Sequence, residues 1–212
     1  MNKKARTILS LAVSFSLLAL TGCGGGNTAK SDKVNIKITL SNDKEIEAEL
    51  YPKIAPKSVE NFVKLIDEGF FEGLIFHRVI SGFMIQGGGY DESFYEGNFN
   101  TKNADTIEGE FASNGFENEL KHERGVLSMA RTQDPNSASS QFFIMHHDAP
   151  HLDGDYAAFG KVTKGIEVVD EIAKGKTTAI DGEILYMGKA YPQTMTDVPE
   201  TPVLIKKIEI IK

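Results

Sequence analysis

The chain has 212 residues, of which 41% are hydrophobic and 25% are charged, a composition typical of globular proteins. It excludes a collagen-like, low-complexity or wholly disordered chain. The formal net charge of −7 argues against a nucleic-acid-binding protein, because a basic face is needed to displace counterions from phosphates. The single cysteine excludes an internal disulfide and a zinc site made of several thiolates.

The first 22 residues have the pattern of an export signal. Three basic residues lie among the first six, and the run at 7–20 that follows carries no charge. As a helix this run would span about 21 Å, short of the roughly 30 Å bilayer core, which indicates a cleaved secretory signal and not a permanent membrane helix. It leads into Leu20-Thr21-Gly22-Cys23, which resembles the bacterial lipobox, whose cysteine is acylated and becomes the new N-terminus. The alternative is an ordinary signal cleaved near Gly22, which would leave an idle thiol.

The sequence therefore predicts an exported lipoprotein with three parts. Residues 1–22 are the signal peptide, 23–33 a flexible tether without apolar periodicity, and 34–212 a single folded domain. Loss of residues 1–22 removes three positive charges and no negative ones, which changes the formal charge from −7 to −10. An anionic bilayer surface would repel such a domain. We therefore expect a lipid on Cys23 to anchor the protein to the bacterial cell membrane, with the domain outside the cytoplasm.

The folded domain is predicted to begin with a hairpin and a helix. Apolar residues alternate strictly along 34–40 and again along 46–50, on either side of a polar turn at 41–44. Pro56 then opens a helical stretch that Gly69 ends. Its apolar stripe has the spacing of an amphipathic helix and consists of Val59, Phe62, Val63 and Ile66.

The rest of the domain is predicted to be mainly β. Short strand-like runs, separated by glycines, lie at 74–80, 83–86, 126–129, 141–145 and 157–162. A second helical stripe, Ile166, Val169, Ile172 and Ala173, ends at Gly175, and a last strand at 203–211 is expected to bulge at Lys206-Lys207. Two helices among many short strands predict a closed or nearly closed antiparallel sheet with plugged ends. Residues 88–124 and 177–202 resist assignment and are interpreted as long excursions over the surface.

Motifs for nucleotide binding and for nucleophilic catalysis are missing from the sequence. Gly87-Gly88-Gly89 lacks a following helix and a P-loop lysine, no serine lies in a G-x-S-x-G elbow, and an acylated Cys23 is no nucleophile. One cluster has metal-ligand chemistry, and it consists of His146, His147, Asp148 and His151. Because Pro150 interrupts it and neighbouring strand residues point to opposite sides, we expect loop histidines and no bound metal. An exported carrier of a metal or small ligand remains an alternative hypothesis.

A second group of residues is unusual for a core strand. Arg78 lies in an apolar run, where its burial is costly unless it is paired or placed at a cleft. An apolar wall and an amide follow at 83–86, and alternation places Gln141 and Phe143 on one side of a second strand. The residues alone therefore predict either a cleft lined by an arginine, amides and aromatic rings, or a core with one salt-bridged arginine.

These segments resemble the cyclophilins, the peptidyl-prolyl cis-trans isomerases. The similarity runs in the family order through residues 76–78, 82–88, 125–130, 140–144, 152–154 and 159–162, and covers most of 34–212. Residues 108–122 resemble the shorter bacterial members. The resemblance implies a mainly β fold, a closed eight-stranded antiparallel β-barrel capped by two α-helices.

The resemblance also implies roles for individual side chains. Arg78 matches the catalytic arginine of the family, and the walls of the proline pocket are matched by Phe83, Met84, Phe143 and Leu152. The groups that hold the substrate peptide are matched by Gln86, Gln141 and the backbone around Ala130. Two positions depart from many eukaryotic members: His151 replaces a tryptophan that contacts cyclosporin, and Tyr156 replaces a histidine.

The implied reaction is the isomerisation of X-Pro bonds in exported proteins, which assists their folding and needs no cofactor. The expected partners are proline-containing, unfolded or partly folded exported polypeptides, and the membrane through the lipid on Cys23. We expect a monomer that binds no nucleic acid. The alternative function is a proline-peptide-binding chaperone or scaffold whose isomerase turnover is incidental.

Overall fold

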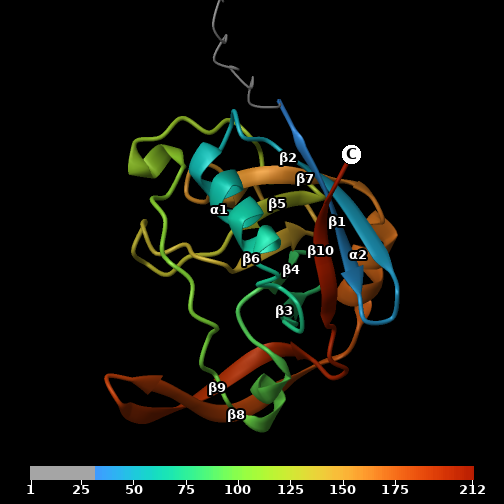
Figure 1. Cartoon of the computed structure of the whole chain (residues 1–212). Coiled ribbons are helices and arrows are strands. Elements are labelled where there is room, and N and C mark those ends of the chain that lie inside the picture. The colour runs from blue at the N-terminus through green and yellow to red at the C-terminus, as the bar shows by residue number, and fades with distance from the viewer. Residues whose placement is uncertain (1–31) are drawn as a thin grey trace, which may run out of the picture.

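The computed structural model describes residues 32–212, so the predicted signal at 1–22, Cys23 and most of the predicted tether lie outside the described residues. Eight strands form one antiparallel sheet in the order β10-β1-β2-β7-β5-β6-β4-β3 (Figure 1). These strands are β1 (Val34–Leu40), β2 (Glu45–Leu50), β3 (Phe76–Ile80), β4 (Met84–Gly87), β5 (Val126–Met129), β6 (Phe142–Met145), β7 (Ala158–Lys164) and β10 (Ile205–Ile211). The two helices are α1 (Pro56–Asp67) and α2 (Ile166–Lys174). Among residues 32–212, no helix combines the length and the hydropathy needed to cross a bilayer.

The sheet curls into a half-barrel, so the expected closed barrel is slightly overstated. Its edge strands, β3 and β10, form no ladder with each other. They are joined by an isolated bridge between Ile75 and Leu204 and by a few backbone hydrogen bonds beside it, such as that from the Phe76 N–H to the carbonyl of Val203 at 2.9 Å. The adjacent Pro202 has no N–H and cannot extend a ladder at this join. The mainly β, eight-stranded antiparallel architecture with two helices is confirmed.

The alternating pattern of the first hairpin is confirmed as the inner wall of the core. Ile36, Ile38 and Leu40 of β1 are buried, and the polar residues between them are not. Burial of each such side chain contributes about 1.5–3 kcal/mol. The apolar stripes of both helices enter the same core, where the Phe62 ring of α1 lies 5.1 Å from the ring of Phe142.

The predicted helix boundaries and bulge are also confirmed. α1 begins at Pro56 and α2 ends at Lys174, directly before Gly175. Thr39 pairs with Lys207 and Leu40 with Ile205, so Lys206 is the extra residue that bulges out of β10.

The cap of α1 comes from a distant part of the chain. Ala55 stands at the N-cap position and makes no side-chain hydrogen bond to the helix. The buried carboxylate of Glu110 takes this role, because it accepts from the N–H groups of Lys57 and Ser58, both at 2.8 Å, and from the Ser58 hydroxyl at 2.7 Å. These N–H groups have no partner within the helix, and a carboxylate also suits the positive end of the helix dipole.

The segment 177–202, which the sequence left unassigned as an excursion over the surface, has a regular structure. This segment forms a two-stranded hairpin, β8 (Thr177–Tyr186) and β9 (Lys189–Pro199), whose side chains are mostly exposed. One face of β8 is only half-buried, and Gly182 stands between its apolar residues Ile180 and Ile184, so the alternation of apolar and polar residues is too weak to predict a strand. Residues 88–124 contain no strand and only two short 3₁₀ turns, η1 (Glu92–Glu96) and η2 (Ala112–Asn114).

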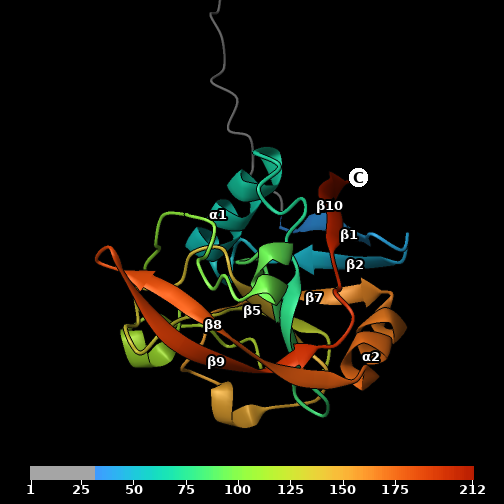
Figure 2. The same ribbon diagram turned by 90° about the horizontal axis from the view of Figure 1, so that it is seen from below.

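The base of the hairpin packs on the other excursion. Val198 joins Ile75, Tyr90, Phe94 and Phe99 in a small buried cluster apart from the main core. The backbones also touch, because a Cβ on Gly182 would lie 2.3 Å from the carbonyl oxygen of Gly97. Seen from below, the hairpin crosses the molecule and extends beyond it at its turn (Figure 2).

His77 of β3 lies against this cluster. Because it is buried, we expect the fold to lose stability in acid. Its ring is 4.6 Å from that of Tyr90, and its Nδ1 has no hydrogen-bond partner among residues 32–212. Burial, and secondarily the charge of Arg78, lowers the pKa of His77 from 6.5 to about 3. The unfolded chain therefore binds an extra proton between about pH 6.5 and pH 3, so stability falls as the pH falls through this range.

We expect the titration of His77 to lower the free energy of unfolding by about 2 kcal/mol at pH 5 relative to pH 7.5. The measurement is urea unfolding at both pH values for the wild type and for His77→Phe, which cannot titrate. The wild type should lose about 2 kcal/mol more than the variant. Equal losses in the two proteins would contradict the assignment.

Candidate functional site

The candidate site lies on the face of β4, β5 and β6 opposite the main core. The register pairs Met84 with Met145 and Gln86 with Phe143, so these side chains share one face. Ile144, which lies between Phe143 and Met145 on β6, enters the main core instead. A second apolar cluster forms on the outer face, and its buried members include Met84, Phe143 and Leu152.

A pocket of about 150 Å³ opens on this face. Eight of the predicted site residues line it together with Arg131, and these eight are Arg78, Phe83, Met84, Gln86, Ala130, Phe143, Leu152 and Tyr156. The other two predicted residues lie beside it. Gln141 accepts a hydrogen bond from the Gln86 amide at 2.9 Å, and the ring of exposed His151 stacks on that of Phe83 at 5.8 Å.

Arg78 stands at the rim of the pocket. It pairs with Gln86 across β3 and β4, which puts the guanidinium beside the amide on one face of the sheet. Its side chain is 41% exposed, so the interpretation as a core arginine with one salt bridge is wrong. The one carboxylate near it among the described residues is that of Asp197, whose Oδ2 lies 3.8 Å from Nε.

A bulge in β9 delivers Asp197 to this position. Thr178 pairs with Val198 and Ile180 with Met195, so β9 has one residue more than β8 between these pairs. Asp197 takes a left-handed conformation there, with φ of 61°. Bulges of this kind re-aim side chains, and aspartate tolerates the left-handed region better than most residues. The hairpin thus brings a charge to the candidate site.

The two amides of the site are held by close backbone packing. The Ala130 N–H donates to the carbonyl of Gln141 at 2.9 Å, which fixes the strand end that carries the Gln141 side chain. Gly88, in the Gly87-Gly88-Gly89 run, has φ of +85°, and a Cβ there would lie 2.8 Å from the carbonyl oxygen of Ser140. Glycine is therefore required directly after β4, where the chain passes this segment.

The buried side chain of His122 packs against Phe143 of the pocket. The ring of His122 stacks on that of Phe143 at 6.1 Å. His122 Nδ1 lies 3.0 Å from Asp153 Oδ1, and Nε2 lies 3.0 Å from the Ser128 hydroxyl. Burial lowers the pKa of His122, against the opposing effect of Asp153, which favours a neutral imidazole. Ser128 is fully buried, so these three side chains hold the ring and offer no reachable nucleophile.

Two residues at the pocket, Arg131 and Asp197, had no role assigned from the sequence. The guanidinium of Arg131 lies 4.7 Å from the Tyr156 ring, and its Nε donates to the carbonyl of Asp155 at 2.9 Å. Its place directly after Ala130 was a signal that could have found it. Asp197 left no such signal, because its contact with β3 depends on how the hairpin folds back.

The histidine cluster is not brought together. His146 is buried, its Nδ1 accepts from the Gly82 N–H at 2.9 Å, and its Nε2 lies 3.3 Å from Asp170. Burial lowers the pKa of His146. His147 is exposed, and within residues 32–212 no three His, Cys, Asp or Glu side chains are placed to hold a metal. His146 instead ties the turn that carries Phe83 to α2.

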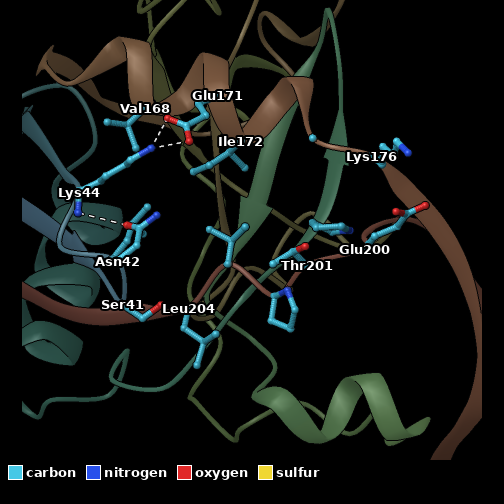
Figure 3. A pocket seen from close by; sticks show the side chains of 15 residues that line it. Ser41, Asn42, Lys44, Val168, Glu171, Ile172, Lys176, Glu200, Thr201 and Leu204 are labelled. Carbon is cyan, nitrogen blue, oxygen red and sulfur yellow. Dashed lines mark hydrogen bonds and ion pairs between the residues drawn. The ribbon is translucent and has the colours of Figure 1, made fainter.

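A larger hollow of about 510 Å³ lies elsewhere, between the β1–β2 turn, α2 and residues 199–204 (Figure 3). Two of its charges, Lys44 and Glu171, are paired with each other, and the Asn42 side chain accepts from the Lys44 backbone. No aromatic ring lines it. The smaller pocket is the better candidate, because it joins aromatic walls to an accessible guanidinium.

The chemistry available in the smaller pocket is that of binding and polarisation. An apolar ring would fit between Phe83, Met84 and Phe143 while amides at the edge hold a peptide backbone. A guanidinium at the rim can donate hydrogen bonds and never gives up its charge. Such a site can stabilise an electron pair that develops next to a bound apolar ring.

Comparisons with known proteins agree with this geometry. The chain matches the family described as cyclophilin type peptidyl-prolyl cis-trans isomerase/CLD over residues 35–210. It is 36% identical over 207 residues to peptidyl-prolyl cis-trans isomerase A of Dickeya dadantii, which covers 95% of this chain and 97% of that one. A peptidyl-prolyl cis-trans isomerase of Acinetobacter baylyi is 42% identical over 182 residues, 84% of each chain. A Cryptosporidium parvum cyclophilin type peptidyl-prolyl cis-trans isomerase, crystallised in the presence of the dipeptide Ala-Pro, has a TM-score of 0.65 and 28% identity, and covers 84% of this chain and 99% of that one.

Proposed function

The chain belongs to the cyclophilin type peptidyl-prolyl cis-trans isomerases and catalyses that isomerisation, and we propose that it acts on X-Pro bonds of exported polypeptides with Arg78 as its catalytic residue. The observation that carries the residue assignment is the guanidinium at the rim of an apolar pocket. The Ala-Pro dipeptide of the Cryptosporidium parvum structure supports a proline-containing peptide as ligand.

The proposed mechanism follows from the electronic structure of the X-Pro amide. Rotation has a barrier of about 18–20 kcal/mol, because amide resonance is lost when the bond is twisted. The twisted prolyl nitrogen becomes pyramidal and gains a lone pair that accepts a hydrogen bond. Arg78 donates to that lone pair, which the planar ground state lacks, so the interaction favours the transition state.

The other side chains hold the substrate during rotation. Phe83, Met84, Phe143 and Leu152 grip the proline ring, and Gln86, Gln141 and the backbone at Ala130 hold the peptide. Reduction of the isomerisation time from tens of seconds to below a millisecond requires about 7 kcal/mol. A charge-assisted hydrogen bond in a cleft supplies about 3–4 kcal/mol of this, and orientation with loss of water supplies the rest.

We place the enzyme outside the cytoplasm, as a monomer attached to the cell membrane through a lipid on Cys23. The basic start, the short uncharged run and the lipobox-like ending at Cys23 support this location. One acyl chain anchors a protein only marginally, whereas two or three anchor it stably.

We expect Cys23→Ser to abolish incorporation of a radiolabelled fatty acid and to leave an uncleaved precursor or a released soluble protein. The measurement is metabolic labelling with membrane fractionation of wild type and variant. Ser10→Ala, within the uncharged run, is the control and should be labelled like the wild type. Equal labelling of Cys23→Ser and wild type would contradict the lipoprotein assignment and leave the isomerase activity untouched.

A further inference from the structure

The turn end of the β8–β9 hairpin carries an apolar patch that the isomerase site does not use. Among the described residues five large apolar side chains are exposed, and four of them lie at this turn end, the fifth being Ile210. The rings of Tyr186 and Tyr191 lie 6.4 Å apart on one face of the hairpin, and Leu185 points to the other face. We call these four the tip patch: Leu185 (60% exposed), Tyr186 (65%), Met187 (86%) and Tyr191 (46%). Monomeric proteins normally scatter such residues, so a cluster on a protruding arm indicates a contact surface (Figure 2).

The backbone of the patch is strained at its most exposed side chain. Tyr186 pairs with Lys189, so Met187 and Gly188 form a two-residue turn with φ of 50° and 74°. Asparagine, aspartate or glycine normally stands where this turn needs a positive φ, and methionine there costs about 1 kcal/mol or more. The other non-glycine residues of 32–212 with positive φ are both aspartates. Within this chain Met187 gains almost no burial in return, so a contact with another molecule explains its presence.

The position of the hairpin points to a polypeptide as the molecule in contact. Its base reaches the isomerase site, where Asp197 lies 3.8 Å from Arg78. Tyr191 and Asp197 are six residues apart on β9, about 20 Å along the strand, a distance that about six residues of extended substrate would also span. β1 begins at the opposite side of the molecule from the hairpin, so a membrane at that end would face away from the tip patch (Figure 1).

The chemistry of the patch suits an unfolded chain of variable sequence. Methionine adapts its shape to different partners, and tyrosine offers large contact area with little loss of conformational freedom. Among the described strands β9 has a hydrogen-bonded ladder only to β8, and its base lies against β3. The outer edge of β9 is therefore open toward the turn, where an extended segment can pair by strand addition.

We propose that the tip patch is a second binding site for the polypeptide substrate, which holds an apolar segment about six or more residues away from the X-Pro bond in the pocket. This inference rests on the proposed function, because it takes the substrate to be an unfolded polypeptide. The site slows the dissociation of long substrates. It has no effect on short peptides, which cannot reach both the tip patch and the pocket.

The test compares short and long substrates in a variant without the patch. The variant combines Leu185→Thr, Tyr186→Thr, Met187→Asn and Tyr191→Thr, which keeps strand-forming residues in the strands and a turn-forming one in the turn. The substrates are an X-Pro tetrapeptide and a reduced, carboxymethylated protein whose refolding is limited by proline isomerisation. We expect kcat/KM on the tetrapeptide to stay within twofold and kcat/KM on the protein to fall about tenfold through KM.

Ile210→Thr removes the remaining exposed apolar side chain and should change neither value. Unchanged kcat/KM of the patch variant on the long substrate would overturn the proposal, and so would equal losses on both substrates. A wild type that turns over the tetrapeptide but not the protein would contradict the proposed function instead.

A cross-linking experiment with the full chain identifies the molecule that the tip patch binds. Photoreactive p-benzoylphenylalanine replaces Met187 in the full chain, anchored in phosphatidylglycerol-containing vesicles, and the carboxymethylated protein is added before irradiation. A cross-link to that protein is the expected result. Cross-links only to phospholipid, or only to a second copy of this chain, would overturn the proposal and assign the patch to the membrane or to a dimer.

Discussion

Arg78→Ala is expected to lower kcat/KM for a short X-Pro peptide by about 10²–10³-fold, equivalent to about 3–4 kcal/mol of transition-state stabilisation. Affinity for the same peptide should fall much less, because the planar amide nitrogen has no lone pair for the guanidinium. The measurement is exchange NMR of the isomerisation rate, with a binding titration on the same sample. The fold should persist, since the pair with Asp197 is partly exposed and contributes at most about 1 kcal/mol.

Two further variants separate the charge of Arg78 from the geometry of its guanidinium, and catalysis from substrate binding. Arg78→Lys should restore little, because an ammonium keeps the charge but loses the planar fork that can face substrate and Asp197 together. Phe143→Ala should weaken binding and turnover together, since the ring contacts the proline in both planar and twisted states. Near-normal turnover in folded Arg78→Ala would refute the catalytic role and favour a proline-peptide-binding chaperone with incidental turnover.

Glu110→Ala is expected to lower the free energy of unfolding by about 3–5 kcal/mol, although the residue does not line the pocket. The carboxylate accepts three hydrogen bonds at the start of α1, and its loss leaves the N–H groups of Lys57 and Ser58 without their partner. The substitution also removes a negative charge from the positive end of the helix dipole. The measurement is equilibrium urea unfolding followed by circular dichroism.

Glu108→Ala is the matched control. Glu108 is two residues away and pairs with the side chain of Lys57 on the exposed surface, so its loss should cost less than about 1 kcal/mol. Glu110→Gln should fall between the two, because the amide keeps one oxygen acceptor and loses the charge. A Glu110→Ala protein as stable as the control would contradict the distant cap.

Strictly local patterns let the sequence determine much of the fold. Alternation placed Ile36, Ile38 and Leu40 on one inner face, and the slip of that alternation located the bulge at Lys206. The proline before α1 and the glycine after α2 marked helix ends. These features depend on residues that are neighbours in the chain, so the signal is complete in the sequence.

The candidate site was predictable for a different reason. Most of its residues lie on short strands whose order the cyclophilin resemblance supplied, and β-sheet register then brings Arg78 to Gln86 and Gln86 to Phe143. Composition and alternation alone left a cleft and a salt-bridged core equally possible. The exposure of Arg78 at the rim of the pocket decided between them.

Only the tertiary structure decided the rest, because the residues involved are distant in the chain and carry no periodic signal. Glu110 caps a helix that begins 54 residues earlier, and Asp197 reaches Arg78 through a bulge in a hairpin with almost no buried face. Neither contact changes the local pattern of apolar and polar residues. By itself the sequence determined an export signal pattern, a β-rich cyclophilin fold and the residues around a proline pocket. The tertiary structure determined that the sheet stops short of closure, that 177–202 forms an arm, and that the arm meets the guanidinium, since these depend on how separate segments pack in space.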